Sequence, residues 1–186
     1  SEMGPLLLSR ILNLSDVQSD ILRIIFRIAD EEGLLLLDLK DLRSMLQYVS
    51  ENCKEYEKSY GKLSTQSLNA ILRSVVALED RGGEEFFGEP AINVKDFFRL
   101  TTNSEGVISI LDAKSVASDP KIYSTFLLYL LSELYENLPE VGDLEKPRMV
   151  FFFDEAHLLF QDTSKVLLEK ITQVTRLIRS KGIGIY

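Results

Sequence analysis

The sequence predicts an α/β protein with parallel strands that also carries a large all-helical subdomain. Two observations support this fold class. In residues 1–100, apolar side chains recur at helical spacing, without the alternation of a half-exposed strand. From residue 107 onward, short apolar runs alternate with long helical segments in the order β-α-β-α-β. Because that order implies parallel strands with right-handed crossovers, we predict a helical subdomain over 1–105 and an α/β part over 106–186.

The composition is typical of a folded globular chain. Its 186 residues are 45% hydrophobic and 27% charged, which is enough apolar material to bury a core. The net charge of −8 argues against a broadly basic nucleic-acid surface, although a ring assembly can still concentrate a few basic loops on DNA. A single cysteine, Cys53, and one histidine argue against an internal disulfide and a structural metal site.

Hydropathy and cysteine usage indicate a cytoplasmic protein that does not enter a membrane. No apolar run approaches the ~20 residues of a membrane span, and the lone Cys53 suits a reducing compartment. Both ends of the sequence lie inside apparent elements, an apolar segment over 3–14 and a strand from 183. We therefore expect a fragment of a longer protein.

The first long helix of the helical subdomain is expected over 16–32. Ser15 is in position to cap its amino end, and Gln18 three residues later completes a capping box. Gly33 follows the last apolar position, where a left-handed residue commonly ends a helix.

Three further caps are expected in the same subdomain. Asp38, Ser64 and Asn93 each precede an apolar stripe at helical spacing, and the last of these helices is short. The run 34–37 is expected to be a packed connection, and the polar run 51–62 a solvated helix end and loop.

Five elements are expected in the α/β part. The β-branched run 107–112 predicts a strand, and Asp119-Pro120 begins a helix that continues to Leu138. A second strand is expected over 148–153, a helix over 164–181, and a third strand from 183.

The run Arg148-Met-Val-Phe-Phe-Phe-Asp-Glu-Ala-His157 is central to the sequence. Its unalternated apolar residues suit a strand buried on both faces, and two carboxylates stand where that strand ends. This is the form of a Walker B motif, in which Asp154 would hold Mg²⁺ through water and Glu155 would orient or deprotonate the attacking water. The alternative is a strand whose end is merely acidic and solvated.

A magnesium ion at this position needs phosphate oxygens as further ligands, because protein alone rarely cages it. Those phosphates are normally held by a loop of the form Gly-x-x-x-x-Gly-Lys-Ser/Thr, the Walker A motif. That motif is absent, since neither Gly82-Gly83 nor Gly182-Ile-Gly184 matches it. We therefore expect the segment alone to bind nucleotide poorly.

Four further residues have two readings each. His157 could relay between the nucleotide and a neighbouring element, or pair with a nearby acid or backbone group. Arg176 and Arg179 could reach phosphate in this or an adjacent subunit, or serve the helix dipole at the end of their helix. For Lys181 the dipole reading is preferred.

Four stretches together resemble one family, the bacterial HerA-like helicases once catalogued as a domain of unknown function. The resemblance lies in Ser1–Arg10, Phe87–Pro90, Val150–Phe160 and Arg176–Gly182, and it covers nearly the whole chain. Asp-Glu-Ala-His alone would be a weak signal, but the combination is specific.

The resemblance implies a P-loop ATPase of the RecA-like type with an additional strand and a catalytic glutamate, related to the HerA and FtsK DNA translocases. Asp154 then matches the Walker B aspartate and Glu155 the catalytic glutamate, with ATP and Mg²⁺ as cofactors. It further implies a DNA substrate, homo-oligomeric and possible hexameric ring assembly, and a helical subdomain inserted in the NTPase core. The family's glycine loop lies upstream of this segment.

Two other readings compete with this motor. The literal Asp-Glu-Ala-His suggests a superfamily-2 helicase, but the upstream Pro-Thr-Arg-Glu and Thr-Pro-Gly motifs of that class are absent from 1–147. A non-enzymatic helical interaction module with a vestigial NTPase core is the third reading. The activity of a variant at Glu155 discriminates the first reading from the third.

Overall fold

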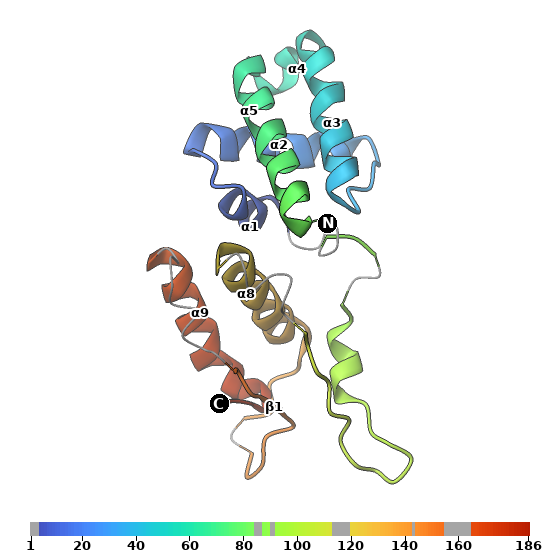
Figure 1. The fold of residues 1–186 in the computed structure, drawn as a ribbon, viewed down its shortest axis with the longest axis vertical. Helices are drawn as coiled ribbons and strands as arrows, with labels where there is room; N and C mark the ends of the chain where they lie inside the picture. Colours follow the sequence, from blue (N-terminus) through green and yellow to red (C-terminus); the bar gives the residue numbers. More distant parts are fainter. Residues whose placement is uncertain (1–3, 84–86, 90–91, 113–119, 143, 155–164) are drawn as a thin grey trace. The chain divides into compact units, whose positions relative to one another are not determined.

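The computed structural model describes residues 4–83, 87–89, 92–112, 120–142, 144–154 and 165–186. The chain forms two compact units, Ser1–Ala91 and Ile92–Tyr186 (Figure 1). The expected boundary between 105 and 106 lies inside the second unit. The assignment of 1–105 as an insertion in an NTPase core stays a prediction.

The first unit consists of packed helices. α2 packs against α1 and α5, and α3 packs against α5 and α4. Its centre is formed by fully buried aliphatic side chains from α2, α3 and α5, among them Leu22, Ile25, Ile28, Leu42, Leu46, Leu68 and Ile71. The elements are α1 (Gly4–Ile11), α2 (Asp16–Glu31), α3 (Leu39–Glu51), α4 (Cys53–Tyr60), α5 (Thr65–Leu78) and a π-helical turn η1 (Glu79–Gly83).

The predicted helix caps of this unit are confirmed. The Ser15 side chain accepts from the Gln18 N–H, and the Gln18 side chain accepts from the Ser15 N–H at 3.0 Å. Asp38 and Asp41 form a second capping box at α3, and the Ser64 side chain accepts from the Ser67 N–H at the start of α5. Gly33 has φ 68°, the left-handed conformation expected after α2.

The expectation that 51–62 is a solvated helix end and loop is wrong in one respect, because most of the run is helical. Residues Cys53–Tyr60 form α4, and the Tyr56 ring is buried. The physical reason is a contact between helices, because the Tyr56 hydroxyl donates to the Glu32 carboxylate just after α2. A polar run whose partners lie on another helix has no apolar stripe to reveal it.

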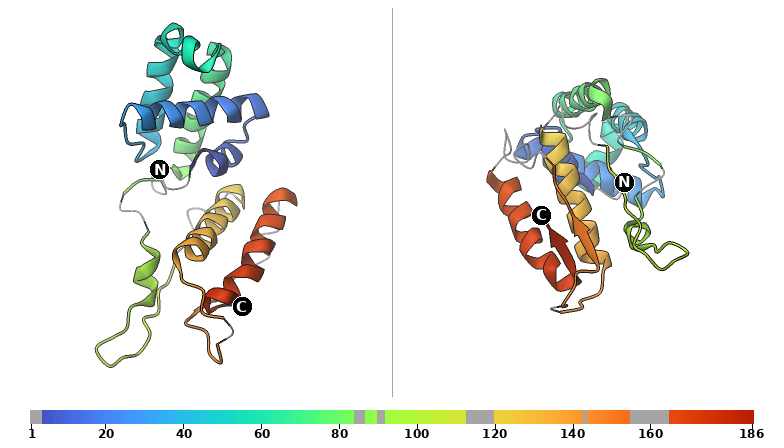
Figure 2. Two further views of the ribbon diagram at one scale, coloured as in Figure 1. Left: turned by 180° about the vertical axis from the view of Figure 1, so that it is seen from behind. Right: turned by 60° about the horizontal axis from the view of Figure 1, so that its bottom comes forward.

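The second unit combines helices with a small sheet. Strands β1 and β2 pair in parallel, with Met149 opposite Ile183 and Phe151 opposite Ile185. Helix α9 joins the two strands, and α8 lies alongside α9 (Figure 2). The elements are η2 (Val94–Phe98), α8 (Pro120–Asn137), β1 (Met149–Phe151), α9 (Lys165–Leu177), η4 (Ile178–Lys181) and β2 (Ile183–Ile185).

The predicted βαβ unit at the end of the chain is thus confirmed, as is the short helix capped by Asn93. Helix α8 is buried from Ile122 to Leu131, and its carboxyl end is exposed at Glu136 and Asn137. None of the helices in the described part of the chain is long and apolar enough to cross a membrane.

The predicted strand over 107–112 is not formed. The structure assigns residues 107–112 to no strand, and Ile108 and Ile110 are 88% and 90% exposed. Its start is held in a hairpin instead, because the Val107 N–H donates to the Arg99 carbonyl at 3.2 Å beside a bridge between Leu100 and Gly106. A β-branched run favours a strand but does not indicate which segment that strand pairs with.

The expectation that 148–153 is buried on both faces is also wrong. Residues Met149–Phe151 are half-buried, and Phe152 is 79% exposed. Full burial of a parallel strand requires neighbours at both edges and cover on both faces. In the described residues β1 has one neighbour, β2. The described residues therefore form a mostly helical chain with one parallel pair of strands, and the P-loop core stays a prediction.

Candidate functional site

Asp154 lies beyond the carboxyl ends of the two paired strands. The ladder continues one step past β1, because the Tyr186 N–H donates to the Phe151 carbonyl and the Phe153 N–H to the Tyr186 carbonyl, both at 2.9 Å. Asp154 follows in an exposed turn. Because β1 and β2 are parallel, both strands end at this edge, which is where open α/β sheets bind ligands.

Glu155 and His157 fall outside the described residues. Their predicted roles as catalytic base and as relay therefore stay predictions. Of the two predicted acidic residues, Asp154 and Glu155, only Asp154 lies in the described part of the chain.

The donor set suits a metal shared with a ligand. In the described ranges, no group of three or more His, Cys, Asp and Glu side chains could hold a metal ion. A single exposed carboxylate fits Mg²⁺ bound largely by water and phosphate oxygens, as this ion prefers.

The two arginines lie toward the opposite end of the sheet, where the strands begin. Arg176 is in the last turn of α9, and Arg179 is in η4, which leads into the amino end of β2. Asp154 follows the carboxyl end of β1, which runs in the same direction. The ladder of hydrogen bonds runs from the Arg148 N–H to the Phe153 N–H and spans about 16 Å at about 3.3 Å per residue. Neither arginine therefore lies at the end of the sheet that Asp154 occupies.

Arg176 also borders an open surface depression of about 500 Å³. The described residues that line it all lie on α9, namely Leu168, Glu169, Thr172, Gln173, Arg176 and Leu177. The depression is therefore formed by a single helix. None of the residues that line it lies at the end of a strand.

Lys181 has a structural role that the sequence did not reveal. Its buried Nζ donates to the Leu138 carbonyl at 2.8 Å and lies 3.3 Å from the Glu140 carboxylate. The ammonium also lies 4.9 Å from the centre of the Tyr135 ring. Lys181 thus bonds to a carbonyl just past the end of α8, a helix other than its own, while the predicted interaction with its own helix dipole stays a prediction.

Two aromatic rings at the carboxyl edge also escaped the sequence reading. Phe152 and Tyr186 stack with ring centroids 5.7 Å apart, and they are 79% and 74% exposed. Phe151 and Phe153 stack on the opposite face at 6.0 Å. Side chains alternate between the two faces of a strand, so Phe152 must face away from Phe151 and Phe153. Because all three positions are phenylalanine, the sequence does not show which face is exposed.

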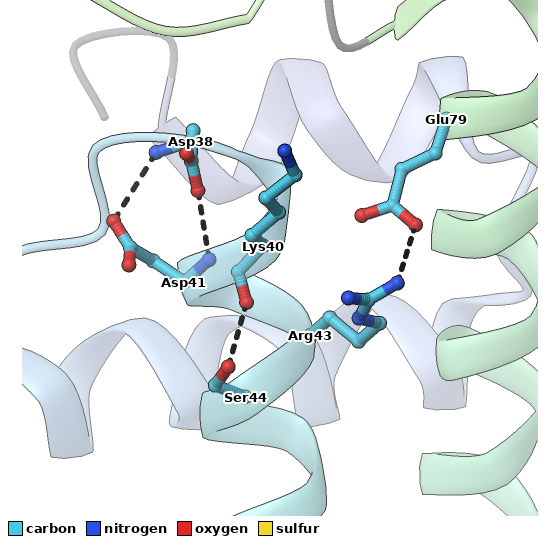
Figure 3. A network of polar contacts seen from close by, with 6 residues as sticks. All are labelled: Asp38, Lys40, Asp41, Arg43, Ser44 and Glu79. Atoms are coloured by element: carbon cyan, nitrogen blue, oxygen red, sulfur yellow. Dashed lines mark hydrogen bonds and ion pairs between the residues drawn. The ribbon is translucent and has the colours of Figure 1, made fainter.

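A separate polar cluster lies in the first unit (Figure 3). The Arg43 guanidinium donates to Glu79 Oε2 at 3.0 Å, and the Glu79 side chain is only 7% exposed. Nearby on α3, Asp38 and Asp41 cap the helix and the Ser44 hydroxyl donates to the Lys40 carbonyl. Because these contacts satisfy helix ends and join α3 to η1, the cluster is structural.

The fold and site together define a mostly helical chain with a small parallel sheet and an acidic residue beyond the carboxyl ends of its strands. The chain belongs to the HerA-like helicase family, because the family model described as "Helicase HerA-like C-terminal" matches residues 1–186. No curated protein and no solved structure matches the sequence. The predicted family is confirmed, and membership indicates a fragment of a HerA-like motor.

Proposed function

We propose that this chain forms the metal-holding and water-activating half of an ATP-hydrolysing motor of the HerA and FtsK kind. The observation that carries the proposal is the position of Asp154, an exposed carboxylate directly after a parallel strand, in a chain of the HerA-like family. Walker B aspartates occupy this position because nucleotide phosphates approach the carboxyl edge of the sheet.

The roles of the two acids follow from their order. Asp154 would hold Mg²⁺ through water, and the ion would neutralise charge on the phosphates. Glu155 would accept a proton from the water that attacks the terminal phosphorus while the bond to the leaving oxygen breaks. The phosphates would be held by a glycine loop outside these residues, so the segment alone should turn over little ATP.

The arginines fit a role in an adjacent subunit better than one in the same subunit. Arg176 and Arg179 lie toward the amino end of β2, away from the edge that Asp154 occupies. In a ring, one subunit's arginine can complete the phosphate site of its neighbour. His157, two residues after Glu155, is proposed as a relay between the nucleotide and the neighbouring element.

DNA is the proposed substrate, and a cytoplasmic homo-oligomer, such as a hexamer, is the proposed assembly. Both rest on the family, whose name denotes helicases. With a net charge of −8, the chain would contact DNA through a few basic loops and not through a broad surface.

The test is Glu155→Gln in the full-length protein. We expect ATP turnover to fall by about 10²–10⁴-fold, because the base is lost while nucleotide binding is kept. Glu145→Gln, at an exposed position before β1, is the matched control and should leave turnover unchanged. Undiminished turnover in the Glu155 variant would contradict the assignment and favour the non-enzymatic module.

A further inference from the structure

We propose that Lys181 is a positioning residue for Arg179, and that it holds this arginine where it reaches a phosphate bound by the adjacent subunit. The inference rests on the proposed function, in which an arginine of one subunit completes the phosphate site of its neighbour. Lys181 itself is not available to a phosphate, because its side chain is 10% exposed and its ammonium donates within its own unit. Its effect must therefore pass through η4, the turn that it shares with Arg179.

Arg179 is an exposed residue between two buried ones. Ile178 is fully buried and Lys181 is 9% exposed, and both belong to η4. The Arg179 carbonyl accepts from the Gly182 N–H at 2.9 Å, and Gly182 adopts the left-handed conformation with φ 77°. The main chain that carries the guanidinium is therefore fixed on both sides, while Arg179 lies at the surface.

The loop between α8 and β1 bonds to the main chain of this turn. The Val141 and Gly142 N–H groups donate to the Ser180 carbonyl at 2.9 and 3.2 Å, and the Arg148 N–H donates to the Gly182 carbonyl at 2.7 Å. The loop also packs closely here, because a Cβ at Gly182 would lie 3.0 Å from Val141 Cγ2. The turn is thus bonded to the loop on both sides of Lys181.

Lys181 adds a side-chain bond to these main-chain bonds. Its Nζ lies 2.8 Å from the Leu138 carbonyl oxygen, 3.3 Å from the Glu140 carboxylate and 4.9 Å from the centre of the Tyr135 ring. Hydrogen bonds have defined lengths and directions. A buried ammonium also loses its hydration, so it is stable only where such partners are in place. The side chain therefore selects one position of η4 on the end of α8, and with it one position of Arg179.

That position matters because an arginine stabilises the transferred phosphoryl group only when its N–H groups reach the oxygens. A misplacement of about 1 Å can cost about 10²-fold in rate. We therefore expect Lys181→Met in the full-length protein to lower ATP turnover by about 10–10²-fold. Lys146→Met, at an exposed position, is the control and should leave turnover unchanged. Wild-type turnover in Lys181→Met would overturn the proposal.

Mixed assemblies separate positioning from damage to the fold. Glu155→Gln subunits lack the proposed base but keep Arg179, whereas Arg179→Ala subunits keep the base but offer no arginine to the neighbour. In a randomly mixed ring about one site in four combines both intact groups, so turnover should recover to about a quarter of the wild-type value. Lys181→Met should recover in the same way when mixed with Glu155→Gln, and should not recover with Arg179→Ala.

The outcomes of the mixing distinguish this proposal from the proposed function. Recovery for Arg179→Ala but not for Lys181→Met would overturn the proposal and show that Lys181 acts on its own site or on the fold. Absence of recovery in both mixtures would also overturn it, because Arg179 would then not act across subunits. Undiminished turnover of Glu155→Gln alone would instead contradict the proposed function.

A second variant keeps the test decisive if Lys181→Met does not fold. Glu140→Lys places another cation beside the ammonium, at a side chain that is 64% exposed. We expect turnover to fall by about two- to fivefold, and turnover per Glu140→Lys subunit to rise on mixing with Glu155→Gln. Glu145→Lys, the same substitution at another exposed position, is the matched control. Equal turnover of the Glu140 and Glu145 variants would overturn the proposal.

Discussion

The Nζ of Lys181 lies 2.8 Å from the main-chain oxygen of Leu138, so the last turn before β2 is bonded to the carboxyl end of α8. The two residues lie 43 positions apart in the sequence. The bond joins the end of α8 to η4, which leads into the amino end of β2. The ammonium also satisfies a helix carbonyl that has no partner within its own helix.

Replacing Lys181 should therefore destabilise the second unit. Lys181→Met keeps most of the buried stem but removes the charged donor, and we expect a loss of about 1.5–3 kcal/mol. Denaturant unfolding of the full-length protein, compared with wild type, measures it. Lys146→Met, at an exposed position, should change stability by less than about 0.5 kcal/mol. Equal effects of the two variants would contradict the assigned role of Lys181.

Two arginine–carboxylate pairs of similar length should differ in their contribution to stability. Arg43 lies 3.0 Å from Glu79, whose side chain is 7% exposed, whereas Arg23 lies 3.2 Å from an exposed Asp20. Arg43→Leu leaves a buried carboxylate without its partner, and we expect a loss of about 2–4 kcal/mol. Arg23→Leu is the control and should cost under about 1 kcal/mol. Thermal unfolding of both variants distinguishes them, and a reversed order would show that burial is not the deciding factor.

Stability on the acid side should depend on Tyr60. Its hydroxyl donates to Glu31, and this bond, followed by the bond from Arg27, lowers the pKa of the Glu31 carboxyl. A lowered pKa stabilises the fold above the unfolded-state value, about 4.3, and that stability is lost as pH falls through the folded-state pKa. Tyr60→Phe should raise the pKa of Glu31 in an NMR titration and reduce the loss of stability with acid.

A second variant isolates that effect. With Glu31→Gln already present, Tyr60→Phe should leave the slope of stability against pH below pH 5 unchanged, because no carboxylate remains to titrate. A pH-dependent effect of Tyr60→Phe in that background would show that another group is responsible.

The proposed metal role of Asp154 predicts a change in magnesium dependence. In the full-length protein, Asp154→Asn should raise the Mg²⁺ concentration needed for half-maximal ATP turnover by at least about tenfold, because a neutral amide is a poorer partner for a hydrated cation. Asp96→Asn, on η2, is the matched control. Turnover measured over a magnesium series decides, and an unchanged midpoint with reduced maximal turnover would contradict metal holding.

Local signals in the sequence predicted the helices well. The capping box of Ser15 and Gln18 and the cap at Asp38 depend on residues three positions apart, so the pattern contains both partners. Contacts between distant segments carry no such pattern. The helix Cys53–Tyr60 and the bond from Lys181 to Leu138 therefore had to be seen in the structure.

The candidate site was predicted in part for the same reason. The apolar run and its carboxylates located Asp154 at the end of a strand, because strand and acid are adjacent in sequence. The strand expected at 107–112 was wrong in the described arrangement, since pairing depends on which edge is reachable and not on propensity alone. The roles of Glu155, His157, Arg176 and Arg179 stay predictions.

The exposed stack of Phe152 on Tyr186 marks a suitable position for a fluorescent probe. The sequence contains no tryptophan, so Phe152→Trp would introduce the chain's one indole at the edge that Asp154 occupies. Indole emission shifts to shorter wavelength when water is displaced from around the ring. Binding of a nucleotide near this residue can then be followed in real time as a change in the wavelength and intensity of the emitted light.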